Sequence, residues 1–231
     1  MTTFGLVHGG GHGAWCWDLL TPELQARGHD AVAMDVAIDR ADLTLERAAG
    51  TVAAALAGHP GHVLVGHSLA GSYLPLAAAR SGARMMIFLC AQIPAEGRSR
   101  MQVQAAEPGS VLADRADFDW DDEGRMVIPP DVARRRFFGD CDDDVAAWAI
   151  ARLRPQALCA LFDEPLPMGC WPDIPSAYIL GRDDASVSAD WARVAAREHL
   201  GVEAIELESA HSPFLSQPAV LADVLANLAT R

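Results

Sequence analysis

The stretch from Val63 to Gly71 constrains the fold and the chemistry of this chain more than any other. It opens with a short apolar run that predicts a buried strand, and residues 69–80 have the apolar spacing of a helix. Ser68 lies between the two, flanked by small residues. In a strand–turn–helix unit a serine presents its hydroxyl at the carboxyl edge of a parallel sheet, and the next backbone N–H, that of Leu69, points toward the group under attack. The stretch therefore predicts a nucleophilic serine.

The turn departs in one position from the usual string G-x-S-x-G. Ala70 stands two residues after the serine, and Gly71 follows one residue later. This position faces the preceding strand closely, so it needs a small side chain. Alanine is the smallest substitute for glycine, and we therefore expect a working turn.

The rest of the chain alternates between predicted strands and helices. Before residue 92 the apolar patterns predict strands at 4–7, 31–34, 63–65 and 84–89 and helices at 15–27, 44–57 and 69–80. After residue 176 they predict strands at 177–180 and 204–207 and helices at 189–199 and 218–228. This rhythm is typical of a doubly wound, mostly parallel sheet of the α/β class.

The alternation is interrupted between residues 92 and 175. This segment is richer in proline and aspartate, and helical spacing recurs at 132–138, 145–153 and 156–162. We expect residues 1–91 and 176–231 to form the α/β core and residues 92–175 to form a mostly helical cap over the carboxyl edge of its sheet.

A serine nucleophile needs a base, and the base needs a carboxylate that holds its tautomer. His211 follows the last predicted strand and Asp184 follows the strand before it, so both lie at the same sheet edge as Ser68. The chain order Ser–Asp–His is that of the α/β-hydrolase arrangement. Asp183 is the competing acid, but the spacing G-x-x-D-x-x-V favours Asp184.

The loop after the first strand is rich in glycine and histidine. Glycine lets a backbone approach a reacting carbonyl closely, so we assign the N–H groups of Gly10 and Leu69 to an oxyanion hole. No carboxylate is predicted beside His8 or His12, and these residues are expected, with Gly9, to support the loop.

These motifs resemble a known branch of the α/β-hydrolases. The run from His8 to Trp17, the turn around Ser68, and the cap strings at 137–141 and 153–156 look like those of plant methylesterases and hydroxynitrile lyases, a branch that includes a salicylate methyl ester hydrolase. The resemblance covers nearly the whole chain. It implies an enzyme without a cofactor that hydrolyses small apolar or aromatic esters through an acyl-enzyme.

Two positions separate the activities within that branch. The lyases carry threonine after the first histidine of the loop and lysine after the catalytic histidine, where this chain has Gly9 and Ser212. Without the lysine a leaving cyanide has no charge partner, which disfavours cyanohydrin cleavage. The esterases share the glycine but commonly carry methionine at the second position. Ser212 differs from that methionine, so this position does not identify the substrate.

Aromatic and polar residues are candidates to line the substrate pocket: Trp120, Phe138, Trp148, Phe162 and Ser212. Aromatic side chains at helical spacing equally suit a plain core. The acidic run at 140–144 lacks the glycine and the distal glutamate of a calcium loop, and no metal site is predicted.

Two alternatives come from other classes of protein. Residues 9–14 satisfy G-x-G-x-x-A between a strand and a helix, and Asp35 ends the next strand, as in an NAD-binding dehydrogenase. That reading leaves Ser68, Asp184 and His211 as coincidences. A non-hydrolytic enzyme or a ligand-binding protein on the same scaffold is the second alternative, because a fold does not determine a function.

Composition limits the partners and the compartment. The chain has 231 residues, 51% of them hydrophobic, which suffices for one domain, and its net charge of −13 disfavours nucleic acid and anionic membranes. Its five cysteines are scattered without a C-x-x-C pair, which favours a reducing compartment. With no secretory leader or membrane-length run, we expect a cytoplasmic protein that binds a small ester; assembly as a homodimer is left open.

Overall fold

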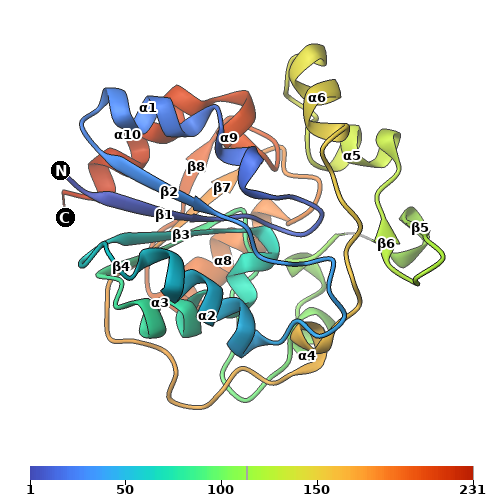
Figure 1. Ribbon diagram of the computed structural model, residues 1–231, viewed down its shortest axis with the longest axis horizontal. Coiled ribbons are helices and arrows are strands. Elements are labelled where there is room, and N and C mark those ends of the chain that lie inside the picture. The colour runs from blue at the N-terminus through green and yellow to red at the C-terminus, as the bar shows by residue number, and fades with distance from the viewer. Residues whose placement is uncertain (113, 231) are drawn as a thin grey trace.

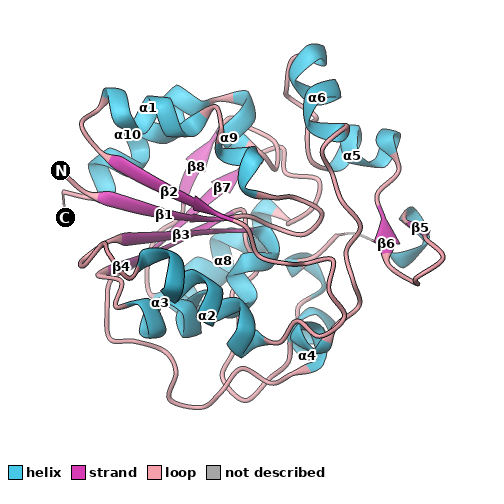
Figure 2. Cartoon of the chain, in the orientation of Figure 1, coloured by secondary structure: helices cyan, strands magenta, loops and turns pink. Residues whose placement is uncertain are grey.

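The computed structural model describes residues 1–112 and 114–230, which build a twisted parallel sheet between two layers of helices (Figures 1 and 2). The sheet has six strands in the order β2-β1-β3-β4-β7-β8, and every pair in it is parallel. The strands are β1 (Thr3–Val7), β2 (Asp30–Met34), β3 (Val63–His67), β4 (Met85–Leu89), β7 (Ser176–Gly181) and β8 (Ile205–Leu207). The predicted α/β class with a doubly wound sheet is confirmed.

Helices cover both faces of this sheet (Figure 1). One face carries α1 (Leu20–Ala26), α9 (Pro213–Ser216) and α10 (Pro218–Leu228), and the other carries α2 (Leu45–Leu56), α3 (Leu74–Ser81) and α8 (Ala189–Leu200). Successive strand residues point to opposite faces: Val63 and Val65 of β3 pack under the first layer and Leu64 under the second. A strand buried on both faces is a continuous apolar run, which is why its pattern was readable in the sequence.

Prolines divide two of the predicted helices. The helix predicted at 15–27 becomes a 3₁₀ turn (Ala14–Trp17) followed by α1, and the helix predicted at 69–80 becomes a 3₁₀ turn (Ser68–Tyr73) followed by α3. Pro22 and Pro75 have no N–H to donate, so each is tolerated only near a helix start, where that donor has no intrahelical partner. By contrast α2 begins as predicted, because Thr44 Oγ1 accepts the N–H of Arg47 at 3.1 Å.

The segment from residue 92 to 175 lies largely beyond the arrowhead ends of the strands (Figure 1). It holds α4 (Arg100–Ala106), 3₁₀ turns at Pro108–Ser110 and Arg115–Asp117, β5 (Asp119–Trp120), β6 (Met126–Val127), α5 (Pro130–Arg136), α6 (Asp143–Ile150) and α7 (Ala160–Asp163). The antiparallel pair β5–β6 was not expected. The helix predicted at 156–162 shrinks to α7, because Gln156 instead pairs with Met126 as an extended strand would.

The turn after β3 has the backbone that a nucleophile on a sharp corner requires. Ser68 has φ 53°, in the left-handed region that side chains other than glycine rarely occupy. Ala70 is fully buried, and the closest approach falls one residue later. A Cβ atom on Gly71 would lie 2.2 Å from the carbonyl oxygen of Gln92, so only glycine fits there.

Replacement of Gly71 by alanine is therefore expected to lower the free energy of unfolding by about 1–3 kcal/mol or more, since the clash is with backbone. Gly50→Ala is the matched control. Gly50 lies inside α2 with no atom within 4 Å of its Cβ position, so this change should raise stability by up to about 1 kcal/mol. Urea unfolding of both variants measures the two signs. Equal stability of Gly71→Ala and wild type would contradict the contact.

None of the helices in residues 1–112 and 114–230 combines the length and the apolar character needed to cross a bilayer.

Candidate active site

Ser68 lies where β3 gives way to the 3₁₀ turn, and it lines a cavity of about 250 Å³. The cavity is walled on one side by the loop after β1 and on the other by side chains of the segment 92–175. Among the described residues, the Ser68 hydroxyl makes no hydrogen bond. It is therefore open to the cavity.

Asp184 and His211 come together at the carboxyl edge of the sheet, after β7 and β8. His211 Nδ1 donates to Asp184 Oδ2 at 2.8 Å, and the two side chains are almost fully buried. The second carboxylate oxygen accepts the backbone N–H groups of Ser186 and Val187 at 2.7 and 2.9 Å. The carboxylate is thus held from both sides and aimed at one ring nitrogen, which leaves the other nitrogen as the site for a proton.

The neighbouring acid, Asp183, has a different environment. Its side chain is exposed, and the hydrogen bond that involves this residue is from its backbone N–H to the carbonyl of Ser209. Of the two candidate acids, the structure brings only Asp184 to His211.

His67 connects the turn of Ser68 with the loop of His211. Its Nε2 donates to the carbonyl oxygen of His211 at 3.0 Å, and the two imidazole rings lie 4.6 Å apart. Burial lowers the pKa of His67, so this ring is neutral and suited to donate to a carbonyl. In the described part of the chain Ser68 Oγ and His211 Nε2 are not joined by a hydrogen bond; such bonds often tighten only when substrate is bound.

The loop after β1 passes close to Ser68. A Cβ atom on Gly9 would lie 2.8 Å from Ser68 Cβ, so glycine is required at that position. Gly10 and Leu69 both line the cavity beside the serine. Within the described residues the N–H of Gly10 has no acceptor, and it is free to donate to an oxyanion.

Two histidines hold this loop through its carbonyl groups. His8 Nδ1 donates to the Gly9 oxygen at 2.8 Å while its Nε2 accepts the N–H of Val36 at 3.0 Å. His12 Nδ1 donates to the Gly10 oxygen at 2.7 Å. Burial lowers the pKa of His12 to about 3, so its ring stays neutral. These contacts are of the kind expected for loop support.

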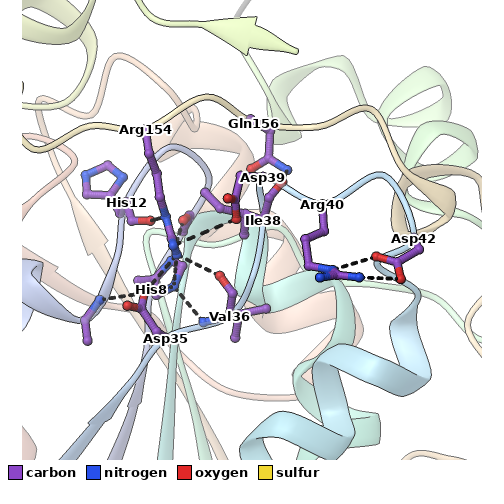
Figure 3. Close-up of polar contacts among 12 residues, drawn as sticks. His8, His12, Asp35, Val36, Ile38, Asp39, Arg40, Asp42, Arg154 and Gln156 are labelled. Carbon is purple, nitrogen blue, oxygen red and sulfur yellow. Dashed lines mark hydrogen bonds and ion pairs between the residues drawn. The ribbon is translucent and has the colours of Figure 1, made fainter. Parts of the chain in front are cut away.

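Arg154 joins the loop to the segment 92–175 (Figure 3). Its Nε donates to the carbonyl of His12 at 2.9 Å, and its Nη2 donates to the carbonyl of Val36 and to Asp35 Oδ1, both at 2.8 Å. Asp35 is thus engaged with protein groups, which removes the ribose-binding acid that the dehydrogenase alternative needs.

Residues 6–224 match the model described as the alpha/beta hydrolase family. The chain belongs to this family. The dehydrogenase alternative is accordingly not favoured.

Individual relatives agree with this membership. The chain is 29% identical to "Probable esterase PIR7A" of Oryza sativa subsp. indica, over 99% of this chain and 97% of that protein. It is 27% identical to "Methylesterase 2" of Arabidopsis thaliana, over 98% and 95%. The crystal structure of polyneuridine aldehyde esterase shares the fold, with a TM-score of 0.84, 23% identity and 99% of each chain covered. The resemblance to the plant methylesterase branch is confirmed.

The α/β-hydrolase cavity contains two of the five predicted pocket residues. Trp120 and Phe162 line it. The other three lie elsewhere. Phe138 is fully buried with its ring 5.8 Å from that of His12, Trp148 packs edge-on against Trp15, and Ser212 is fully buried. Phe138 and Ser212 are thus buried in the core, and Trp148 is partly buried against its neighbours. Periodicity does not reveal this packing of helices and loops.

Gln156 and Arg100 are among the cavity residues that the sequence did not single out. Gln156 is buried; its Nε2 donates to the carbonyl of Ile38 at 2.9 Å, and its Oε1 faces Gly10 without a partner among the described residues. The available signal was a lone glutamine before an apolar run in the segment 92–175. The direction of this side chain toward Gly10 depends on the strand-like pairing of Gln156 with Met126.

Cys90 lies against the Asp184–His211 pair. Its sulfur, a carboxylate oxygen of Asp184 and a ring nitrogen of His211 lie within 4.8 Å of one another. Burial, and then the charge of Asp184, raise the pKa of the Cys90 thiol. A protonated thiol is a weak metal ligand but can donate to a carboxylate, so this cluster suits an oriented acid better than a metal centre.

Arg154→Met is expected to lower kcat by roughly 10- to 100-fold, because small misplacements of an active-site loop are costly. Arg152→Met is the matched control: Arg152 lies two residues away in the segment 92–175, 4.4 Å over the ring of Trp148, and its contacts are with Trp148 and not with the loop. Steady-state ester hydrolysis by both variants provides the measurement. An Arg154→Met enzyme with unchanged kcat would mean that the histidines alone position the loop.

Proposed function

We propose that the protein hydrolyses small apolar or aromatic carboxylic esters, methyl esters among them, through an acyl-enzyme on Ser68. The observation that carries this proposal is the buried Asp184–His211 pair at the sheet edge where Ser68 stands on a strained turn. The names of the relatives, esterase and methylesterase, support ester hydrolysis. The cavity wall is largely apolar, with Met101, Val111 and Phe118 among its residues, which supports an apolar substrate.

Acylation begins with proton transfer from Ser68 to His211. The serine oxygen attacks the ester carbonyl, and the resulting oxyanion accepts hydrogen bonds from the N–H groups of Gly10 and Leu69. Each such donor lowers the barrier by about 3 kcal/mol. Protonated His211 then gives its proton to the leaving alkoxide, and the alcohol departs.

Deacylation repeats these steps with water. His211 takes a proton from the water, the hydroxide attacks the acyl-enzyme, and Ser68 recovers its proton as the acid leaves. Asp184 remains ionised throughout and stabilises the imidazolium that forms in each half-reaction.

The position of Ser212 supports hydrolysis over cyanohydrin cleavage. It follows His211 directly, is fully buried and carries no charge, so it supplies no cation for a leaving cyanide. Residues 92–175 act in this proposal as the cap that encloses the substrate. The five free, buried cysteines support a reducing, cytoplasmic location.

The test is turnover together with covalent labelling. Wild-type protein is expected to hydrolyse short-chain p-nitrophenyl esters and aryl methyl esters, and a fluorophosphonate probe should modify Ser68 in the peptide map and abolish turnover in parallel. A folded, monodisperse protein that neither turns over these esters nor takes up the probe would overturn the proposal.

A further inference from the structure

The cavity beside Ser68 has one charged group in its wall. Among the described residues that line it, Arg100 alone carries a formal charge, whereas acidic residues dominate the chain as a whole. Arg100 opens α4, and its guanidinium lies 4.9 Å over the ring of Phe162, another wall residue. A positive charge therefore faces the space in which the substrate binds.

This guanidinium has no carboxylate partner among the described residues, whereas most arginines of the chain have one. Arg136 and Arg193 each pair with a carboxylate, but Arg100 forms no ion pair with any described residue. Its Nε is buried without an acceptor, and its contact from Nη1 to Gln104 Oε1 is long, at 3.5 Å. Most N–H donors of the Arg100 guanidinium therefore have no close acceptor among the described residues.

An unpaired charge in such a place is unfavourable without a ligand. Removal of a guanidinium from water is costly unless an anion or strong acceptors replace the water, and stacking on one phenylalanine ring compensates only in part. Burial lowers the pKa of Arg100 to about 10, which still leaves the group protonated at neutral pH. An anion in the cavity would complete the site.

We propose that Arg100 binds a carboxylate of the substrate, so that the preferred substrate is a monoester of a dicarboxylic acid. The planar guanidinium matches a carboxylate in a two-bond fork. Because Ser68 and Arg100 line the same cavity, one small molecule can present its ester to the serine and its acid to the arginine. The largely apolar wall of this cavity suits a hydrocarbon or aromatic group between the ester and the acid of the substrate. This inference rests on the proposed function.

The reaction remains a simple hydrolysis. Water supplies the hydroxyl of the new carboxyl group and the proton of the released alcohol, and the distal carboxylate is unchanged. The product is a dicarboxylate, whose new acid group ionises at neutral pH and releases one proton.

The experiment compares matched substrates. Monomethyl esters of dicarboxylic acids with six to ten carbons are paired with analogues whose free acid is replaced by a neutral carboxamide. Wild type is expected to favour the acid by roughly 30-fold in kcat/KM, as a desolvated charge pair allows. Arg100→Met should remove this preference by lowering kcat/KM for the acid only, and Arg100→Lys should retain part of it.

Arg98→Met is the matched control, since Arg98 lies two residues earlier on the exposed surface and its change should leave both rates as in wild type. Equal rates for acid and amide in wild type, unaffected by Arg100→Met, would overturn the inference and leave ester hydrolysis intact. In that case the arginine serves only to pack on Phe162.

Binding to Ser68→Ala separates this inference from the proposed function. By titration calorimetry the acid monoester should bind Ser68→Ala at least roughly 30-fold more tightly than it binds the Ser68→Ala, Arg100→Met double variant. That result in a protein that hydrolyses no ester would retain the carboxylate site and reject the esterase. Equal binding to the two variants would reject the carboxylate site.

Discussion

Ser68→Ala is expected to lower kcat/KM for ester hydrolysis by roughly 10⁴-fold or more, because no acyl-enzyme can form without the serine oxygen. The oxyanion donors and the cavity remain, so a small residual rate over that of water should persist. The change shortens the side chain by one exposed oxygen that makes no hydrogen bond in the described structure. The variant should therefore unfold at nearly the same urea concentration as wild type.

The control for this variant is Ser72→Ala, in the same 3₁₀ turn. Ser72 is buried and its Oγ has no partner in the described structure, so its removal should leave the rate unchanged and stability equal or slightly higher. The comparison is made by hydrolysis of p-nitrophenyl butyrate, with each rate divided by the concentration of folded protein. Similar rates for Ser68→Ala and wild type would exclude Ser68 as the nucleophile.

Asp184→Asn is expected to lower kcat by roughly 10³- to 10⁴-fold. The carboxylate accepts the Nδ1–H of His211 and so leaves Nε2 unprotonated to act as the base. An asparagine amide can instead donate to Nδ1, which stabilises the wrong tautomer, and it provides no charge to stabilise the imidazolium. The two backbone N–H contacts to Oδ1 can be kept by the amide oxygen, so the fold should survive.

Asp183→Asn tests the competing acid with the same chemical change one residue away. Its side chain is exposed, so activity should stay at the wild-type level. The two variants are best compared over a range of pH, because loss of the correct tautomer changes the pH profile as well as the maximal rate. A larger loss in Asp183→Asn than in Asp184→Asn would reassign the acid.

Arg154 links the segment 92–175 to the loop after β1. His8 and His12, which hold the loop after β1, are tied through Arg154 to the segment 92–175. Movement of that segment would therefore disturb the loop as well as the cavity wall. The position of this segment and that of the loop after β1 are thus linked through Arg154.

The sequence by itself determined the sheet and the positions of Ser68, Asp184 and His211 along it. Apolar runs of strand length alternate with helical patterns, and parallel strands bring their carboxyl ends to one edge. Residues that directly follow three such strands must then lie near one another. Both the class of fold and the three site candidates follow from local pattern and this single topological rule.

Only the tertiary structure decided what the cavity is made of. Trp120 and Phe162 line it while Phe138 and Trp148 do not, although all four look alike in the sequence. The same holds for Arg100, which has no carboxylate partner in the described part of the chain because of how α4 packs against α7. Short helices and an irregular hairpin can pack in many ways, and periodicity specifies which face of an element is apolar but not which neighbour covers that face.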